Sequence, residues 1–125
     1  MGAVRFTKDH EWIQMEDDNI GVVGITDYAQ DQLGELVYVE LPEIDQELGT
    51  GSDAVVIESV KAAGEVKAPV SGSVVEVNEA LVDEPEKVNN DPMGDGWFIK
   101  IKVANTDELE DLMDEDAYKE YIDDL

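Results

Sequence analysis

Residues 54–69 read AVVIESVKAAGEVKAP, and this stretch decides the fold. Two short strand-like runs, Ala54 to Ile57 and Glu65 to Ala68, flank a tight turn and predict a β-hairpin. Lys61 lies at its tip and is the only lysine or arginine in positions 9–66. An amine displayed on a rigid tip can be acylated, which removes its charge and makes the side chain the stem of a longer arm. The alternative is an ordinary solvated turn lysine.

Further strand signals lie on both sides of this hairpin. Alternating or apolar runs punctuated by Gly and Pro predict strands at residues 11–15, 20–25, 37–41, 70–77 and 97–103. In the last run, Trp97, Ile99, Ile101 and Val103 are expected on one face, opposite Lys100 and Lys102. The longest irregular segment is expected at residues 83–96. Many short strands of this kind predict an antiparallel sandwich or barrel, with a β core at about residues 4–103.

Helices are expected in two places. Thr26 or Asp27 can cap a short helix from Tyr28 to Leu33, and Gly34 can end it. Apolar residues at helical spacing among the acids of residues 107–125 predict one or two terminal helices, at about 106–123, that pack on the β core. At 125 residues the chain is expected to form one domain, 1–125.

The composition excludes several classes of function. Acidic residues outnumber Lys and Arg by 32 to 8, for a formal net charge of -24, so nucleic acids and anionic membranes are not expected partners. The acids are spread along the chain, with 14 in residues 9–60 and 10 in residues 105–125, rather than forming one acidic tail. This pattern predicts a surface adapted to a salt-rich cytoplasm, a halophile signature. The alternative is an acidic docking face for basic partners.

Cysteine is absent, which excludes disulfides and thiolate metal sites, so no metal site is expected. Any thiol chemistry must therefore come from an attached group. The chain has no apolar run near the roughly 20 residues that span a bilayer, and its start lacks the features of a targeting segment. A cytoplasmic location is expected.

Several short motifs occur together with the lysine, in a fixed order. They are His10-Glu11-Trp12, Gly24 to Gln30 followed by Leu33-Gly34-Glu35, Val39-Glu40-Leu41-Pro42, Glu58-Ser59-Val60-Lys61-Ala62, Ala68 to Gly72 running on to Asn78, and Asp95-Gly96-Trp97. Through them the chain resembles the lipoyl and biotinyl carrier domains, and among these the H proteins of the glycine cleavage system. The resemblance covers about residues 4–122.

The neighbours of the lysine distinguish related carriers. Biotin carriers typically flank their lysine with methionines, and the lipoyl domains of 2-oxo acid dehydrogenase complexes usually carry an acid just before it. Here the neighbours are Val60 and Ala62. One departure from the family is Gly64-Glu65, where an acid preceded by Ser is common.

The resemblance implies a barrel-sandwich hybrid fold with lipoate attached to Lys61. It implies that Glu58, Ser59, Val60 and Ala62 form the lipoylation motif and that Gly72 makes the turn of a matching hairpin. It also suggests a cleft for the lipoyl-lysine arm. In this cleft Glu11 would lie near the cationic amine of the aminomethyl group that the loaded arm carries, and His10 and Asp27 belong to neighbouring motifs.

The resemblance further implies a carrier rather than an enzyme. Its partners would be a pyridoxal-phosphate glycine decarboxylase (P protein), a tetrahydrofolate-dependent aminomethyltransferase (T protein), dihydrolipoamide dehydrogenase (L protein), and the lipoate ligase or lipoyl transferase that modifies it. Two alternatives stay open: a lipoyl carrier for other lipoyl-dependent complexes, and an unmodified acidic interaction module.

Overall fold

The computed structural model describes residues 4–125. Residues 1–3, which belong to the expected domain 1–125 and to the chain start where no targeting segment is expected, lie outside the described residues. Among the described residues, no helix is long and apolar enough to cross a membrane, and no group of His, Cys, Asp or Glu could hold a metal ion.

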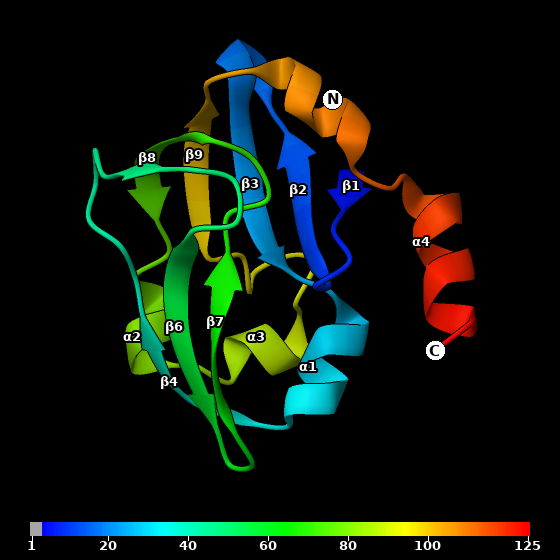
Figure 1. Cartoon of the computed structure of the whole chain (residues 1–125). Coiled ribbons are helices and arrows are strands. Elements are labelled where there is room, and N and C mark those ends of the chain that lie inside the picture. The colour runs from blue at the N-terminus through cyan, green and yellow to red at the C-terminus, as the bar shows by residue number, and fades with distance from the viewer. Residues whose placement is uncertain (1–3) are drawn as a thin grey trace.

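Two antiparallel sheets form the body of the molecule (Figure 1). The larger sheet has the order β1 (Val4–Phe6), β2 (Glu11–Met15), β3 (Ile20–Ile25), β9 (Ile99–Val103), β8 (Gly72–Val77) and β5 (Glu47–Leu48). The smaller sheet has the order β4 (Leu36–Glu40), β6 (Asp53–Ser59) and β7 (Ala63–Lys67). This arrangement confirms the mainly β, antiparallel fold class, and β6 and β7 are the two arms of the hairpin expected around Lys61.

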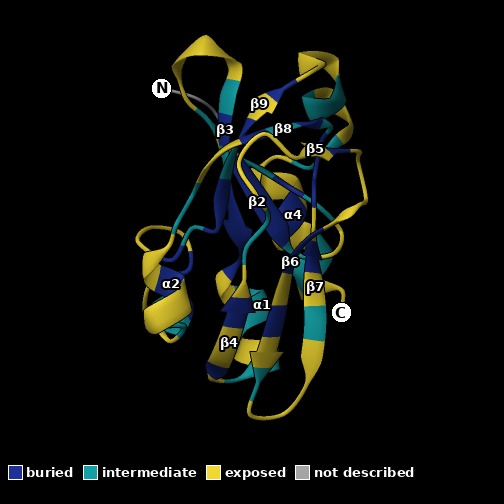
Figure 2. Ribbon diagram, turned by 90° about the vertical axis from the view of Figure 1, so that its left-hand side faces the viewer, coloured by how far each residue is buried: buried dark blue, intermediate teal, exposed yellow. Residues whose placement is uncertain are grey.

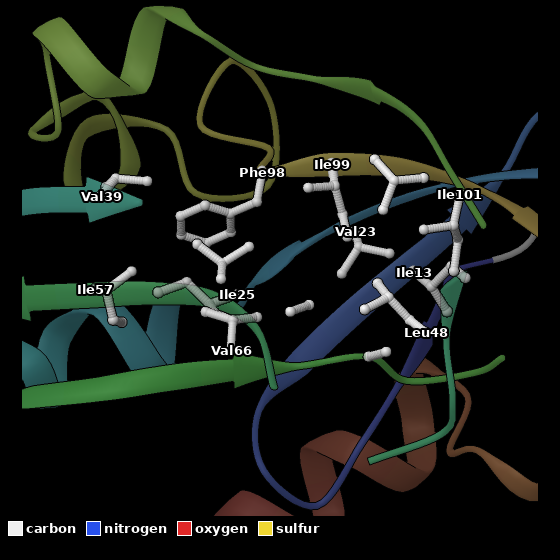
Figure 3. Packing of buried hydrophobic residues seen from close by; sticks show 14 of the residues in the cluster. Ile13, Val23, Ile25, Val39, Leu48, Ile57, Val66, Phe98, Ile99 and Ile101 are labelled. Carbon is white, nitrogen blue, oxygen red and sulfur yellow. The ribbon is translucent and has the colours of Figure 1, made fainter. Parts of the chain in front are cut away.

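The hydrophobic core lies between the two sheets (Figure 3). Alternate residues of the strands face inward, as the period of two requires. Ile13 and Val23 come from the larger sheet, and Ile57 and Val66 come from the smaller one. The residues between them, such as Val56 and Glu65, are exposed.

The entry to β9 corrects one expectation. The strand begins at Ile99, and it is the fully buried Phe98, not Trp97, that joins Ile99 and Ile101 in this core. Trp97 is half-buried and packs against a second cluster instead. The Phe98 N–H donates to the Val23 carbonyl, which holds the chain in this position before the strand starts.

The short internal helix is confirmed as α1 (Asp27–Leu33). The Thr26 side chain caps it by accepting a hydrogen bond from the Ala29 N–H, and Gly34 ends it with a φ of 83°. Residues 83–96, expected to be irregular, in fact contain the end of α2 (Ala80–Asp83) and all of α3 (Lys87–Asn90).

The chain ends in helical segments, as expected: the 3₁₀ helix η2 (Thr106–Asp111) and α4 (Glu115–Asp123). Helix α4 packs on the edge of the larger sheet through Tyr118, whose ring stacks on Phe6 at a centroid distance of 4.5 Å. With Trp12 they form a second hydrophobic cluster. Glu108 fastens η2 by accepting hydrogen bonds from both the N–H and the hydroxyl of Ser71.

Candidate functional site

The hairpin tip is fixed by Ser59. Its N–H donates to the Ala62 carbonyl at 2.7 Å, and its Oγ accepts hydrogen bonds from the N–H groups of Lys61 (3.2 Å) and Ala62 (3.0 Å). A serine hydroxyl that closes a turn on its own backbone is a known local device. The Lys61 side chain is exposed. The backbone is therefore held while the amine stays free to react.

A second contact braces the tip against the segment that joins α1 to β4. The Val60 N–H donates to the Glu35 carbonyl at 3.0 Å, although the Val60 side chain is 64% exposed. The Lys61 stem passes over Gly34: a Cβ at position 34 would lie 2.9 Å from Lys61 Cε. The bare glycine thus leaves room for the lysine stem beside the end of the helix.

A cleft of about 240 Å³ lies beside this hairpin, between β7, the start of β2 and one side of α1. Its lining residues are Asp9, His10, Glu11, Ile25, Ala29, Gln32, Leu33, Ile57, Gly64, Glu65 and Val66. The walls are largely apolar, and the polar groups of residues 9–11 gather in one segment. A cleft of this kind can shelter an elongated, mostly apolar group with one charged end.

Glu11 is the most buried acid of the cleft, with 4% of its surface exposed. Its carboxylate accepts hydrogen bonds from the Thr7 hydroxyl at 2.7 Å and from the Lys67 N–H at 3.2 Å. Burial raises the pKa of Glu11 above its usual value, and the hydrogen bonds from Thr7 and Lys67 oppose this shift. Burial therefore makes the ionised carboxylate less stable than it would be in water.

His10 also lines the cleft, but its ring is committed to a structural contact. Nδ1 lies 2.9 Å from the Tyr118 hydroxyl, which in turn lies 2.7 Å from Thr26 Oγ1. The ring also packs against Tyr28 at 4.6 Å. Burial lowers the pKa of His10, and the nearby charge of Asp9 opposes this shift. His10 therefore fixes the polar end of the cleft whether or not it meets the cargo.

Asp27 does not lie in this cleft, contrary to expectation. As the first residue of α1 it turns toward its own helix and accepts a hydrogen bond from Gln30 Nε2 at 2.8 Å. It lines a separate groove between α1 and α4. Asp27 is close in sequence to residues that line the cleft, but its own side chain does not reach the cleft.

Gly72 also differs from expectation, because it does not make a turn. It is the first residue of β8 and its φ is not positive. A side chain there is excluded because a Cβ would overlap the backbone carbonyl of Lys102 on the neighbouring strand β9. The need for glycine comes from close approach of two strands.

Sequence patterns assigned no role to the apolar walls of the cleft or to Glu65. Ile25, Ile57 and Val66 could have been assigned to a shared inner face from the period of two along their strands. The opening of this face into a cleft could not have been predicted from the strands, because it depends on where α1 packs. Glu65 belongs to the Gly64-Glu65 departure from the family pattern, and both of these residues line the cleft.

Comparisons with known proteins agree with this geometry. A family model for the glycine cleavage H-protein matches residues 4–125. The chain is 54% identical over 125 residues to a glycine cleavage system H protein of Rhodospirillum rubrum, covering 100% of this chain and 99% of that protein. It is 53% identical over 121 residues to one of Thermotoga maritima, covering 97% of each.

A solved structure points the same way. The crystal structure of a glycine cleavage system H protein from Mycobacterium marinum superposes with a TM-score of 0.85 at 35% identity, covering 99% of this chain and 97% of that one. The chain belongs to the glycine cleavage H-protein family, whose members are not enzymes but carry lipoate on a lysine and serve as carriers in glycine cleavage.

Proposed function

We propose that Lys61 is the lipoylated residue and that the chain carries the aminomethyl group of glycine from the P protein to the T protein. The reduced carrier is then reoxidised by the L protein. One observation carries this proposal: a serine-locked tip presents an exposed lysine beside a cleft that ends in a buried carboxylate. A lipoate ligase or lipoyl transferase would recognise the same tip, with Glu58, Ser59, Val60 and Ala62 around the lysine.

The position of the cleft along the hairpin is compatible with a lipoyl-lysine. Such an arm measures roughly 14 Å from sums of ordinary bond lengths. Gly64, Glu65 and Val66 follow Lys61 by three to five positions, which at about 3.3 Å per residue sets an upper limit of roughly 10–17 Å on their distance from the tip. The Glu11 carboxylate bonds the next residue of that strand, Lys67. The end of a folded-back arm would therefore come close to Glu11.

The residues of the cleft suit the cargo as well as the arm. Bound lipoate supplies a disulfide that can accept the aminomethyl group and be regenerated afterwards by oxidation. Ile25, Leu33, Ile57 and Val66 would limit the access of water to it. Glu11 would hold the cationic amine of the cargo by a charged hydrogen bond. Tethering would give an effective concentration on the order of mM at each partner enzyme.

The mass of the Lys61 peptide from natively expressed protein tests the modification. A lipoyl amide on Lys61 and not on Lys67 is expected, because only Lys61 has its backbone N–H tied to Ser59. Lys61→Arg should abolish modification and carbon transfer, whereas the matched Lys67→Arg should retain both. Lipoate found on Lys67, or transfer by the Lys61→Arg protein, would contradict the assignment.

Reconstitution with the partner enzymes tests in which reaction the lipoyl arm takes part. With P, T and L proteins the lipoylated chain should sustain glycine-dependent reduction of NAD. Lipoylated protein that is inactive in this system would favour the alternative of a carrier for other lipoyl-dependent complexes. Unmodified native protein would favour the acidic interaction module.

Three finer expectations remain predictions that we carry forward. The chain, residues 1–125, would fold as one domain, which is supported by a core cluster that draws on both sheets. The location would be cytoplasmic. The evenly spread acids would adapt the surface to high salt, or else provide a docking face for basic partners.

A further inference from the structure

β4 (Leu36–Glu40) is the outermost strand of the smaller sheet. Its only strand partner is β6, so its other edge presents backbone N–H and C=O groups that pair with no strand among the described residues. Near the hairpin tip this edge is closed, because the Leu36 N–H donates to the Asn89 side chain at 2.8 Å. Beyond Leu36 no backbone hydrogen bond closes this edge among the described residues, and α2 packs beside it across a groove. Figure 2 shows β4 at the front of the molecule, with α2 to one side.

A groove of about 530 Å³ runs beside the open part of β4. Leu41 and Val77 contribute apolar surface to it beside the buried Val39, and α2 contributes Val82. Tyr38 and Val82 are 44% and 55% exposed, and both line this groove. An unpaired strand edge beside an apolar groove is the arrangement that proteins use to bind an extended segment as an additional strand.

The charge of the groove selects its occupant. Glu40, Glu79 and Asp83 line it, and none of the eight lysines and arginines of the chain does. A second copy of this chain would bring a net charge of -24 to the same place, so self-association is opposed. A segment that carries cationic side chains would be attracted, and apolar side chains at alternate positions would enter the groove.

We propose that the open edge of β4 and this groove bind an extended segment of a partner protein in which basic and apolar side chains alternate. The proposal rests on the proposed function in one respect, that the partner is one of the P, T or L proteins. The groove shares no lining residue with the cleft beside Lys61. Docking here would hold an enzyme on the same small sheet that carries the lysine hairpin and leave the arm free to move.

Two double variants with the same change of charge test the groove. E79K/D83K reverses the two carboxylates next to or within α2, and E110K/D111K reverses two exposed carboxylates on η2. With lipoylated protein at low salt, E79K/D83K should raise the KM of at least one partner enzyme for the carrier roughly tenfold, and the kcat of that enzyme should not change. E110K/D111K makes the same change of net charge but should leave that KM within about twofold of the parent, since η2 contributes no lining residue to the groove.

Hydrogen exchange locates the contact directly. Amides of residues 37–41 should exchange more slowly when that enzyme is added to the parent, and this protection should be lost in E79K/D83K. Lys61→Arg should keep the protection while carbon transfer fails, which separates this inference from the assignment of the lysine. The inference is overturned if no P, T or L protein protects residues 37–41, if both double variants raise KM equally, or if sedimentation shows that a second copy of the chain covers the groove.

Discussion

Replacement of Glu11 by glutamine should let the aminomethyl cargo decompose faster. Glu11 is 4% exposed, lines the cleft and already accepts hydrogen bonds from Thr7 and the Lys67 N–H. Glutamine keeps the size and one acceptor but removes the charge that would hold an ammonium group. Lipoylation should proceed normally, because the Ser59 turn that presents Lys61 does not involve Glu11.

The expected size follows from the environment of the carboxylate. A hydrogen bond to a charged group contributes about 1.5–3 kcal/mol when it is well shielded. The cleft is open on one side and the carboxylate already has two donors, so we expect about 1–2 kcal/mol. At 1.4 kcal/mol per factor of ten, this corresponds to a release of ammonia about 5 to 30 times faster.

The pH dependence gives this prediction a distinct signature. Burial raises the pKa of Glu11, so lowering the pH through that raised pKa should neutralise the carboxylate and increase leakage from the parent, whereas Glu11→Gln should show no such increase. The contribution of Glu11 to the free energy of unfolding has the opposite dependence on pH. Because its folded-state pKa is raised, the contribution is fully present below the usual 4.5 and is lost as the pH rises through the folded-state pKa. Glu11→Gln therefore should not lose stability at neutral pH through loss of the charge.

Ammonia release from protein loaded by the P protein, in the absence of T protein, measures the effect. Glu43→Gln is a matched control, since Glu43 is exposed and does not line the cleft. Leakage from Glu11→Gln within twofold of the parent, or an equal increase in Glu43→Gln, would refute the role given to Glu11.

Three further predictions concern stability. Glu108→Gln should lower the thermal midpoint at neutral pH, because hydrogen bonds from Ser71 hold the pKa of Glu108 below its usual 4.5. The difference in midpoint from the parent should shrink as the pH falls through that lowered pKa, and a difference that stays constant would contradict the prediction. Gly72→Ala should lower the yield of folded, lipoylated protein, because its Cβ overlaps the Lys102 carbonyl, and a parent-like melting curve would contradict this. Molar KCl should raise the thermal midpoint of the parent by screening its net charge of -24. A comparison of chloride with sulfate separates this screening from the strengthening of apolar burial by salt. A midpoint that does not change from low to molar salt would contradict the halophile interpretation.

Elements defined by their own residues were predictable from the sequence. The α1 helix has a Thr cap, an apolar stripe and a terminal Gly, and it forms where expected. The hairpin of β6 and β7 likewise follows from alternation on both sides of a short turn. Helices α2 and α3 were missed because each has only four residues, and because α3 lies in a segment rich in turn formers.

The candidate site was predictable only in part. Lys61 and its turn are local, so the sequence contains what determines them. Glu11 was chosen through the family resemblance, and the structure brings it to a cleft beside the lysine hairpin. Asp27 was chosen on the same ground, yet its side chain bonds Gln30 within α1. The difference between the two acids is set by strand and helix geometry, which proximity in a motif does not reveal.

His10, at the polar end of the cleft, is held by contacts with the start of α1 and with the C-terminal helix α4. Thr26, which caps α1, bonds the His10 carbonyl through its N–H and lies within hydrogen-bonding distance of Tyr118 through its hydroxyl. The Tyr118 hydroxyl also reaches His10 Nδ1 across 108 positions of sequence. His10 has a φ of 71°, a conformation that a residue other than glycine adopts only when its surroundings hold it. Helix α4 therefore supports the backbone that points Glu11 into the cleft, and the stability of its docking should set how well the cleft retains a charged cargo.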